Sequence, residues 1–181
     1  LKDTELSEGM KEIANTSYRE LINHPPSEVM IDALFKYFRE YLVTGGYMTA
    51  INDVASGGKI DIQTFMTYWE WILGDTLKHR RTENYLREIL NGILKRYASQ
   101  ITWNSISKDL SIDHHKTVSD YCNMLSQMDA IYVQSALLVE SLTAAPKKAK
   151  KIYFSDPFIH HTIHAVLHNF ADPWRDYIEP L

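Results

Sequence analysis

The segment from Asn104 to Tyr132 constrains the fold most, because its pattern predicts two short helices that cross. Asn104 is expected to cap the first helix, SISKDL, and Asp113 is expected to cap the second, HHKTVSDYCNMLSQM. A three-residue turn, Ser111 to Asp113, separates them. The apolar positions expected to face inward are Ile106, Leu110, Val118, Cys122 and Leu125. This is the sequence pattern of a helix-turn-helix.

Runs of β-forming residues flank this motif. ITW, which begins at Ile101, precedes it as a short strand candidate. AIYVQSALLVESL and KKIYF follow it, and the lysine-rich tip TAAPKKAK joins them. A strand, three helices and a two-stranded wing together predict a winged helix-turn-helix with a small β-wing.

The first eighty residues read as helices separated by turn signals. Ser17 with Glu20 makes a capping box, and Pro25-Pro26-Ser27 ends that helix and starts the next. Gly45-Gly46 is expected to end the helix that follows, and Asp61 is expected to cap another. We therefore predict a mostly α chain with three regions: a helical bundle over residues 1–81, a winged-helix domain over 82–155 and a C-terminal helical extension over 156–181.

Apolar residues at helical spacing indicate which faces point inward. On the helix before Gly45 the predicted stripe is Met30 or Ile31, Leu34, Phe38, and Tyr41 or Leu42. On the helix after Asp61 it is Ile62, Phe65, Trp69, Ile72 and Leu73. On the helix opened by Thr82 and Glu83 it is Leu86, Ile89, Leu90, Ile93, Leu94 and Tyr97.

Composition sets limits on function. With 45% apolar residues and 12% aromatics, a 181-residue chain can bury a substantial core. A single cysteine, Cys122, excludes an internal disulfide and indicates a reducing cytosol; it is expected to be a small buried residue, with a reactive thiol as the alternative. No apolar run is long enough to span a membrane. The chain begins without methionine, so we expect it to be a piece of a longer protein.

The second helix of the motif is a candidate nucleic-acid interface. The residues expected on its exposed side or at its exposed start are His114, His115, Lys116, Ser119, Asp120, Asn123 and Gln127. Such positions reach base edges when a helix enters a major groove. This face carries one lysine against one aspartate and no arginine, however, and Asp120 would repel phosphate. A packing or protein-contact role is the competing interpretation.

The wing supplies the second group of candidates. Although the chain has a net charge of -4, four lysines gather in the run PKKAKK: Lys147, Lys148, Lys150 and Lys151. They could bind phosphates beside the helix, or they could simply be a solvated loop tip.

Three histidines, His160, His164 and His168, lie four residues apart, a spacing that places side chains on one helical face and suits two nitrogen ligands to a metal. Asp156 could add an oxygen. No HExxH motif accompanies them, so a partly solvated histidine face is favoured and no metal is expected; a metal-dependent enzyme is the third class considered. No GxxxxGK[ST] loop and no recognisable nucleophile with its base occur, so the chain itself is not expected to be a catalyst.

Several segments, in order, resemble certain prokaryotic AAA-superfamily ATPases of the archaeal type. FKYFREYLVTGGYMTAI resembles the helix ending in Gly-Gly that follows their nucleotide-binding core, where a helical lid begins. YWEWILGDTLKHRRTENYLREIL is similar to the next lid segment, with Gly74, Asp75 and Lys78. KKAKKIYFSDPFIHH is similar to their lysine-flanked strand that ends in Tyr-Phe-x-Asp after the wing. The resemblance covers about residues 30–165.

The resemblance implies a role for each region. Residues 1–81 would be lid-like and would close over ATP and Mg held by an ATPase core N-terminal to this segment, which itself holds no cofactor. The winged helix would relay the change to a protein or double-stranded DNA partner, and Arg80 or Arg81 could touch the γ-phosphate. No membrane partner is expected, and the oligomeric state is open. The alternative is a stand-alone winged-helix DNA-binding transcriptional regulator that dimerises through its N-terminal helices.

Overall fold

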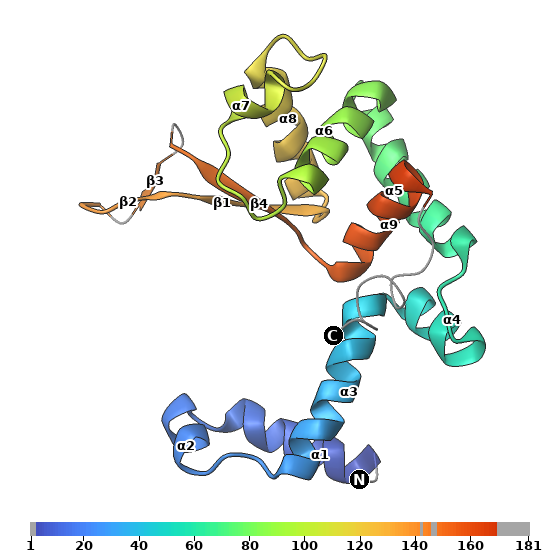
Figure 1. Ribbon diagram of the computed structural model, residues 1–181, viewed down its shortest axis with the longest axis vertical. Helices are drawn as coiled ribbons and strands as arrows, with labels where there is room; N and C mark the ends of the chain where they lie inside the picture. The colour runs from blue at the N-terminus through green and yellow to red at the C-terminus, as the bar shows by residue number, and fades with distance from the viewer. Residues whose placement is uncertain (1–2, 142, 146–147, 170–181) are drawn as a thin grey trace.

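The structure is a computed structural model that describes residues 3–141, 143–145 and 148–169 (Figure 1). The helices in these residues are α1 (Asp3–Asn15), α2 (Tyr18–Asn23), α3 (Glu28–Thr44), α4 (Met48–Gly57), α5 (Ile62–Lys78), α6 (Glu83–Lys95), α7 (Trp103–Ser107), α8 (His115–Gln127) and α9 (Pro157–His168). The strands are β1 (Ile131–Ser135), β2 (Leu137–Leu138), β3 (Thr143–Ala144) and β4 (Lys150–Phe154). The predicted mostly α class with a small β-hairpin is confirmed.

The hairpin extends away from the helices, with β2 and β3 at its far end (Figure 1). Strands β1 and β4 pair antiparallel, with Ile131 opposite Phe154 and Ser135 opposite Lys150. The strand predicted at ITW is reduced to one bridge, in which Ile101 and Lys150 exchange backbone hydrogen bonds of 2.9 Å. The segment before α7 therefore lies along the outer edge of β4.

Local capping explains where several helices begin. Ser17 and Glu20 form the predicted capping box at α2, and Ser27 and Asp61 cap α3 and α5 as expected. Two predicted starts are wrong by one or two residues. Thr102, not Asn104, caps α7, because Ser105 N–H donates to the Thr102 hydroxyl at 3.0 Å. The residue that precedes α8 is His114, not Asp113, and its side chain makes no capping hydrogen bond.

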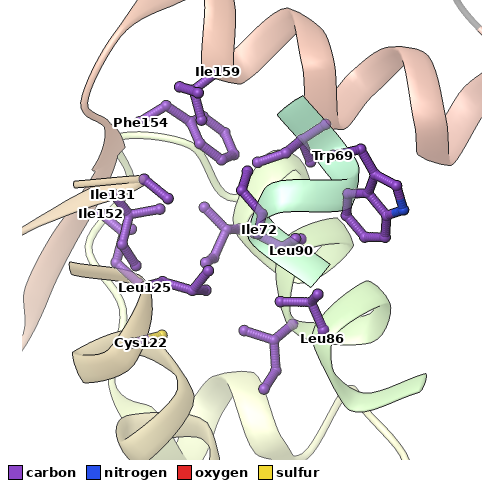
Figure 2. Close-up of a cluster of buried hydrophobic side chains, with 14 of the residues drawn as sticks. Trp69, Ile72, Leu86, Leu90, Cys122, Leu125, Ile131, Ile152, Phe154 and Ile159 are labelled. Carbon is purple, nitrogen blue, oxygen red and sulfur yellow. The ribbon is translucent and has the colours of Figure 1, made fainter. Parts of the chain in front are cut away.

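One hydrophobic core joins α5, α6, α8, the β1–β4 pair and α9 (Figure 2). Fully buried side chains come from each of these elements, including Trp69, Leu90, Leu125, Ile131 and Ile163. The buried cluster extends from Val43 to Ala165, so residues on both sides of positions 81/82 and 155/156 contribute to it. Burial of the inward positions predicted for the helix-turn-helix is confirmed at Ile106, Val118, Cys122 and Leu125, whereas Leu110 is half-buried.

The stripe predicted for α3 is wrong over its middle. Phe38 is 51% exposed, whereas Leu34 is half-buried and Leu42, the alternative to Tyr41, is half-buried against the core. The fully buried residues of this helix are Val43 and Thr44. The reason lies in the arrangement, since α3 runs from α1 and α2 to the main body and its middle turns cross the space between them (Figure 1). Helical periodicity identifies an apolar side but does not supply the element that would cover it. Ile62 and Tyr97, which end the apolar stripes predicted for the helices after Asp61 and Thr82, are likewise exposed.

Candidate functional site

The end of α3 meets the start of α9. The N–H of Gly46 donates to Asp156 Oδ2 at 3.0 Å, and Asp156 Oδ1 accepts the Phe158 N–H at 2.8 Å, which caps α9. Gly45 adopts a φ of +56°, and a Cβ at this position would overlap the Asp156 carboxylate. The glycine pair therefore allows two segments 110 residues apart to approach each other closely.

Neighbouring contacts reinforce this junction. The His161 ring nitrogen Nε2 lies 2.8 Å from the Leu42 carbonyl oxygen, and burial lowers the pKa of His161. Phe158 packs against Tyr47 and Phe65, with ring centroids 4.8 and 5.5 Å apart. Burial, followed by the charge of Asp156, raises the pKa of Tyr47. Helix α9 is thus fixed against both α3 and α5.

The segment from α7 to α8 is attached to α6 at three points. The Glu88 carboxylate accepts hydrogen bonds from the Ser111 N–H at 2.8 Å and from its hydroxyl at 2.6 Å, which holds the turn between α7 and α8. Arg96 donates to the Ser105 carbonyl at 2.9 Å and pairs with Asp109. These side chains tie α7 and the turn to α6.

The third point joins α8 to the start of α6. The Tyr121 hydroxyl lies 2.8 Å from the Thr82 nitrogen and 3.2 Å from the Thr82 carbonyl oxygen. The Arg81 guanidinium lies 5.3 Å from the Tyr121 ring centroid, and its Nη2 is 3.5 Å from Asp120 Oδ2. Sequence reasoning missed this Arg81–Asp120 ion pair. Arg80, by contrast, is exposed in the turn after α5, where its φ is +55°.

The face of α8 is placed largely as predicted. His115, Lys116 and Asn123 are exposed, and Ser119 is half-buried. Asp120 does not act alone as a negative charge on this face, because Arg81 faces it. An open hollow of about 330 Å³ lies beside this ion pair and is lined by His79, Arg81, Asp120, Asn123, Met124 and Gln127. The face therefore combines polar groups of both charge signs.

The four lysines of the PKKAKK run do not act as one group. Lys148 and Lys151 are exposed, whereas Lys147 lies outside the described residues. Lys150 is only 5% exposed, so its predicted role as a phosphate ligand is wrong. Its Nζ lies 4.6 Å from the Trp103 ring centroid and donates to the Lys148 carbonyl at 3.1 Å, and burial lowers the pKa of this lysine. The adjacent tip also exposes an apolar group, Leu137, Leu138 and Val139.

Cys122 is fully buried, as predicted, and burial raises the pKa of its thiol to about 12.

The histidines of α9 differ from one another in exposure. His160 packs against Tyr97 and Phe154, and burial lowers its pKa to about 4, whereas His168 is exposed. In the described part of the chain, no group of three or more His, Cys, Asp or Glu side chains is arranged to hold a metal ion.

Within residues 3–141, 143–145 and 148–169, no helix combines the length and the apolar character needed to cross a membrane.

Comparison with known proteins gives a family and no named relative. Searches of curated proteins and of solved structures found no match. A family model described as a domain of unknown function (DUF8612) matches residues 35–169, from the middle of α3 to the end of α9. Because this match covers more than half of the chain, the chain belongs to the DUF8612 family.

Proposed function

We propose that this chain is the lid and winged-helix module of an ATP-dependent AAA-type ATPase, and that it relays the nucleotide state to a protein or DNA partner. The observation that carries this proposal is the hydrogen bond between Gly46 and Asp156. The Gly-Gly pair and the Tyr-Phe-x-Asp motif are separate parts of the resemblance to these ATPases, and neither motif alone implies contact with the other. The hydrogen bond that joins the two motifs supports a shared structural role for them.

The winged-helix assignment is part of the same proposal. Helices α6, α7 and α8, then the antiparallel β1–β4 pair with Ile101 on its edge, follow the element order of a winged helix. In this assignment α8 takes the recognition position and β2–β3 forms the tip of the wing. The hydrogen bonds of Glu88 and Tyr121 would keep α8 and the turn before it in a fixed position on α6.

A relay of the nucleotide state requires that motion of the lid-like helices reaches α8 and the wing. Packed interiors transmit such motion because they are close-packed and deform little. Here α9 packs on α3 and α5, and the core continues through α6 to α8 and the hairpin. A displacement of the lid-like helices would therefore move α8 and the wing with them. Of the two arginine candidates we place Arg80 first as nucleotide sensor, since Arg81 already faces Asp120.

The experiment is to express the complete product of the gene and to measure ATP hydrolysis. We expect a phosphate-binding loop, Mg-dependent turnover, and no turnover by the 181-residue chain alone. Asp156→Ala should alter turnover in the complete protein if the junction relays the nucleotide state, while Gly57→Ala, at a site where no atom lies within 4 Å of the added Cβ, serves as control. A complete gene product without a phosphate-binding loop would contradict the proposal.

The second candidate is a stand-alone winged-helix DNA-binding regulator. The exposed side chains of His115, Lys116 and Asn123 on α8 favour it, because such groups can reach base edges. Site-selective binding to one duplex, independent of ATP, would support the regulator over the ATPase module. Weak, sequence-independent DNA binding would leave the ATPase module as the better account.

A further inference from the structure

The last two turns of α9 bring two imidazole rings together. His164 and His168 are four residues apart on the helix, and their ring centroids are 4.8 Å apart with an interplanar angle of 44°. His168 is exposed and His164 is half-buried, so an ion from solvent can reach the pair. Neither ring has a role in the function proposed above.

The spacing of these rings matches metal chelation. A metal ion lies about 2.0–2.1 Å from an imidazole nitrogen and hence about 3.2 Å from the ring centroid. Two such ligands at angles of about 90° to 109° place their centroids about 4.5–5.2 Å apart. The observed 4.8 Å falls within this range. The centroids of His160 and His164 are 6.1 Å apart, which is too far, and the His160 ring packs against aromatic residues.

We propose that His164 and His168 bind one divalent transition-metal ion, with water in the remaining coordination positions. Imidazole ligands suit Cu²⁺, Ni²⁺ and Zn²⁺, and affinity should be highest for Cu²⁺. A set of three or more ligating side chains is absent among the described residues. With about half the ligands, and so about half the binding free energy, of a four-ligand zinc site, the dissociation constant should be about 1 μM to 0.2 mM.

Binding would have a structural effect on the helix. Each histidine would use one ring nitrogen for the metal, and its other nitrogen could keep a hydrogen bond. The ion would link residues one turn apart at the end of α9, which packs on α3 and α5. Because only the folded helix holds both rings at this spacing, the metal should raise the melting temperature of the protein.

The test is a titration of the purified, untagged chain with CuCl₂ or ZnCl₂ by calorimetry. Thermal melts with and without EDTA measure the effect on stability, and electron paramagnetic resonance of the Cu²⁺ complex reports the number of nitrogen ligands. We expect one ion per chain, two nitrogen ligands and a reversible rise in melting temperature. His168→Gln, at an exposed position, should keep the fold and weaken binding at least about tenfold, because one of two ligands is lost.

His164→Gln provides the second variant, and His115→Gln provides a matched control. His114 and His115 are also two histidines, but adjacent residues of a helix do not face each other, so this substitution should leave the affinity unchanged. The proposal would be overturned by an equal loss of affinity in His115→Gln and His168→Gln. A dissociation constant above about 1 mM, or an ion bound through one nitrogen, would overturn it as well.

Discussion

Lys150 and Lys151 are neighbours in β4, yet the strand turns their side chains to opposite faces. Side chains alternate along a strand, and Ile152 and Phe154 point into the core, so Lys150 points inward with them. Its alkyl chain is buried and its ammonium lies over Trp103. This outcome could have been predicted from KKIYF, because the same alternation that buries the isoleucine and phenylalanine also buries the first lysine.

The first prediction concerns Gly45. Replacing it by Ala places a side chain at a φ of +56° and against the Asp156 carboxylate, so we expect the free energy of unfolding to fall by about 2–4 kcal/mol. Gly74→Ala is the matched control: this glycine lies inside α5 with open space around it, and the substitution should stabilise the protein by about 0.5–1 kcal/mol. Urea denaturation measures both. Equal stability of Gly45→Ala and the parent would contradict the close approach at this junction.

The second prediction concerns pH. Burial lowers the pKa of His160 from 6.5 to about 4 in the folded protein, so between these values the unfolded chain binds more protons than the folded one. The free energy of unfolding should therefore fall as pH drops from 6.5 to 4, with about 1–3 kcal/mol lost at this residue. Denaturation at several pH values measures this. His160→Gln should show a smaller loss, and an unchanged pH dependence in this variant would refute the assignment.

At the scale of elements, local signals predicted what depends on local sequence. The caps at Ser17, Ser27 and Asp61 are correct because a capping side chain bonds to backbone only two or three residues away. The buried faces of α5 and α6 follow from their apolar spacing. The middle of the α3 face, at Phe38, was predicted wrongly, because its exposure depends on whether another element covers it.

The candidate site likewise has some features that local sequence predicts and others that depend on how the elements pack. Exposure of Lys116 and Asn123 follows from helical geometry, once Val118, Cys122 and Leu125 are taken as the inward side. The Arg81–Asp120 pair and the Gly46–Asp156 hydrogen bond join residues far apart in sequence. No spacing rule connects such positions, so only the packing of the elements reveals them.

The third prediction tests the packing of α8. Leu125 is fully buried, and Leu125→Ala should lower the free energy of unfolding by about 2–5 kcal/mol, because burial is lost and a cavity forms. Asn123→Ala, on the exposed side of the same helix, should change it by less than about 0.5 kcal/mol. Chemical denaturation measures both variants. Similar effects of the two substitutions would mean that the faces of α8 are assigned wrongly.

For the molecule as a whole, charge distribution limits any contact with DNA. The net charge of -4 repels phosphates, so attraction must come from a local group of lysines. Of the four lysines in the PKKAKK run, Lys150 is buried, which leaves Lys148 and Lys151 exposed and Lys147 outside the described residues. Since α8 presents no arginine for guanine, binding should be weak and nearly independent of sequence.

The fourth prediction quantifies this by fluorescence titration with duplex DNA at several salt concentrations. Each lysine that neutralises one phosphate contributes about -0.9 to the slope of log affinity against log salt, so Lys148 and Lys151 together give about -1.8. Lys151→Ala should flatten the slope by about 0.9, and Lys150→Met should leave it unchanged because Lys150 is buried. A change of slope in Lys150→Met would show that this lysine reaches DNA after all.

Asp120→Asn completes the same experiment. It removes a carboxylate from α8 and also releases Arg81, which lies 3.5 Å away, for contact with phosphate. Both changes should strengthen binding, and the released arginine should steepen the salt slope by up to about 0.9. If no DNA is bound at low salt by the parent or by Asp120→Asn, the proposed contact between α8 and DNA is contradicted. Tight, site-selective binding that ignores salt would contradict the argument from charge.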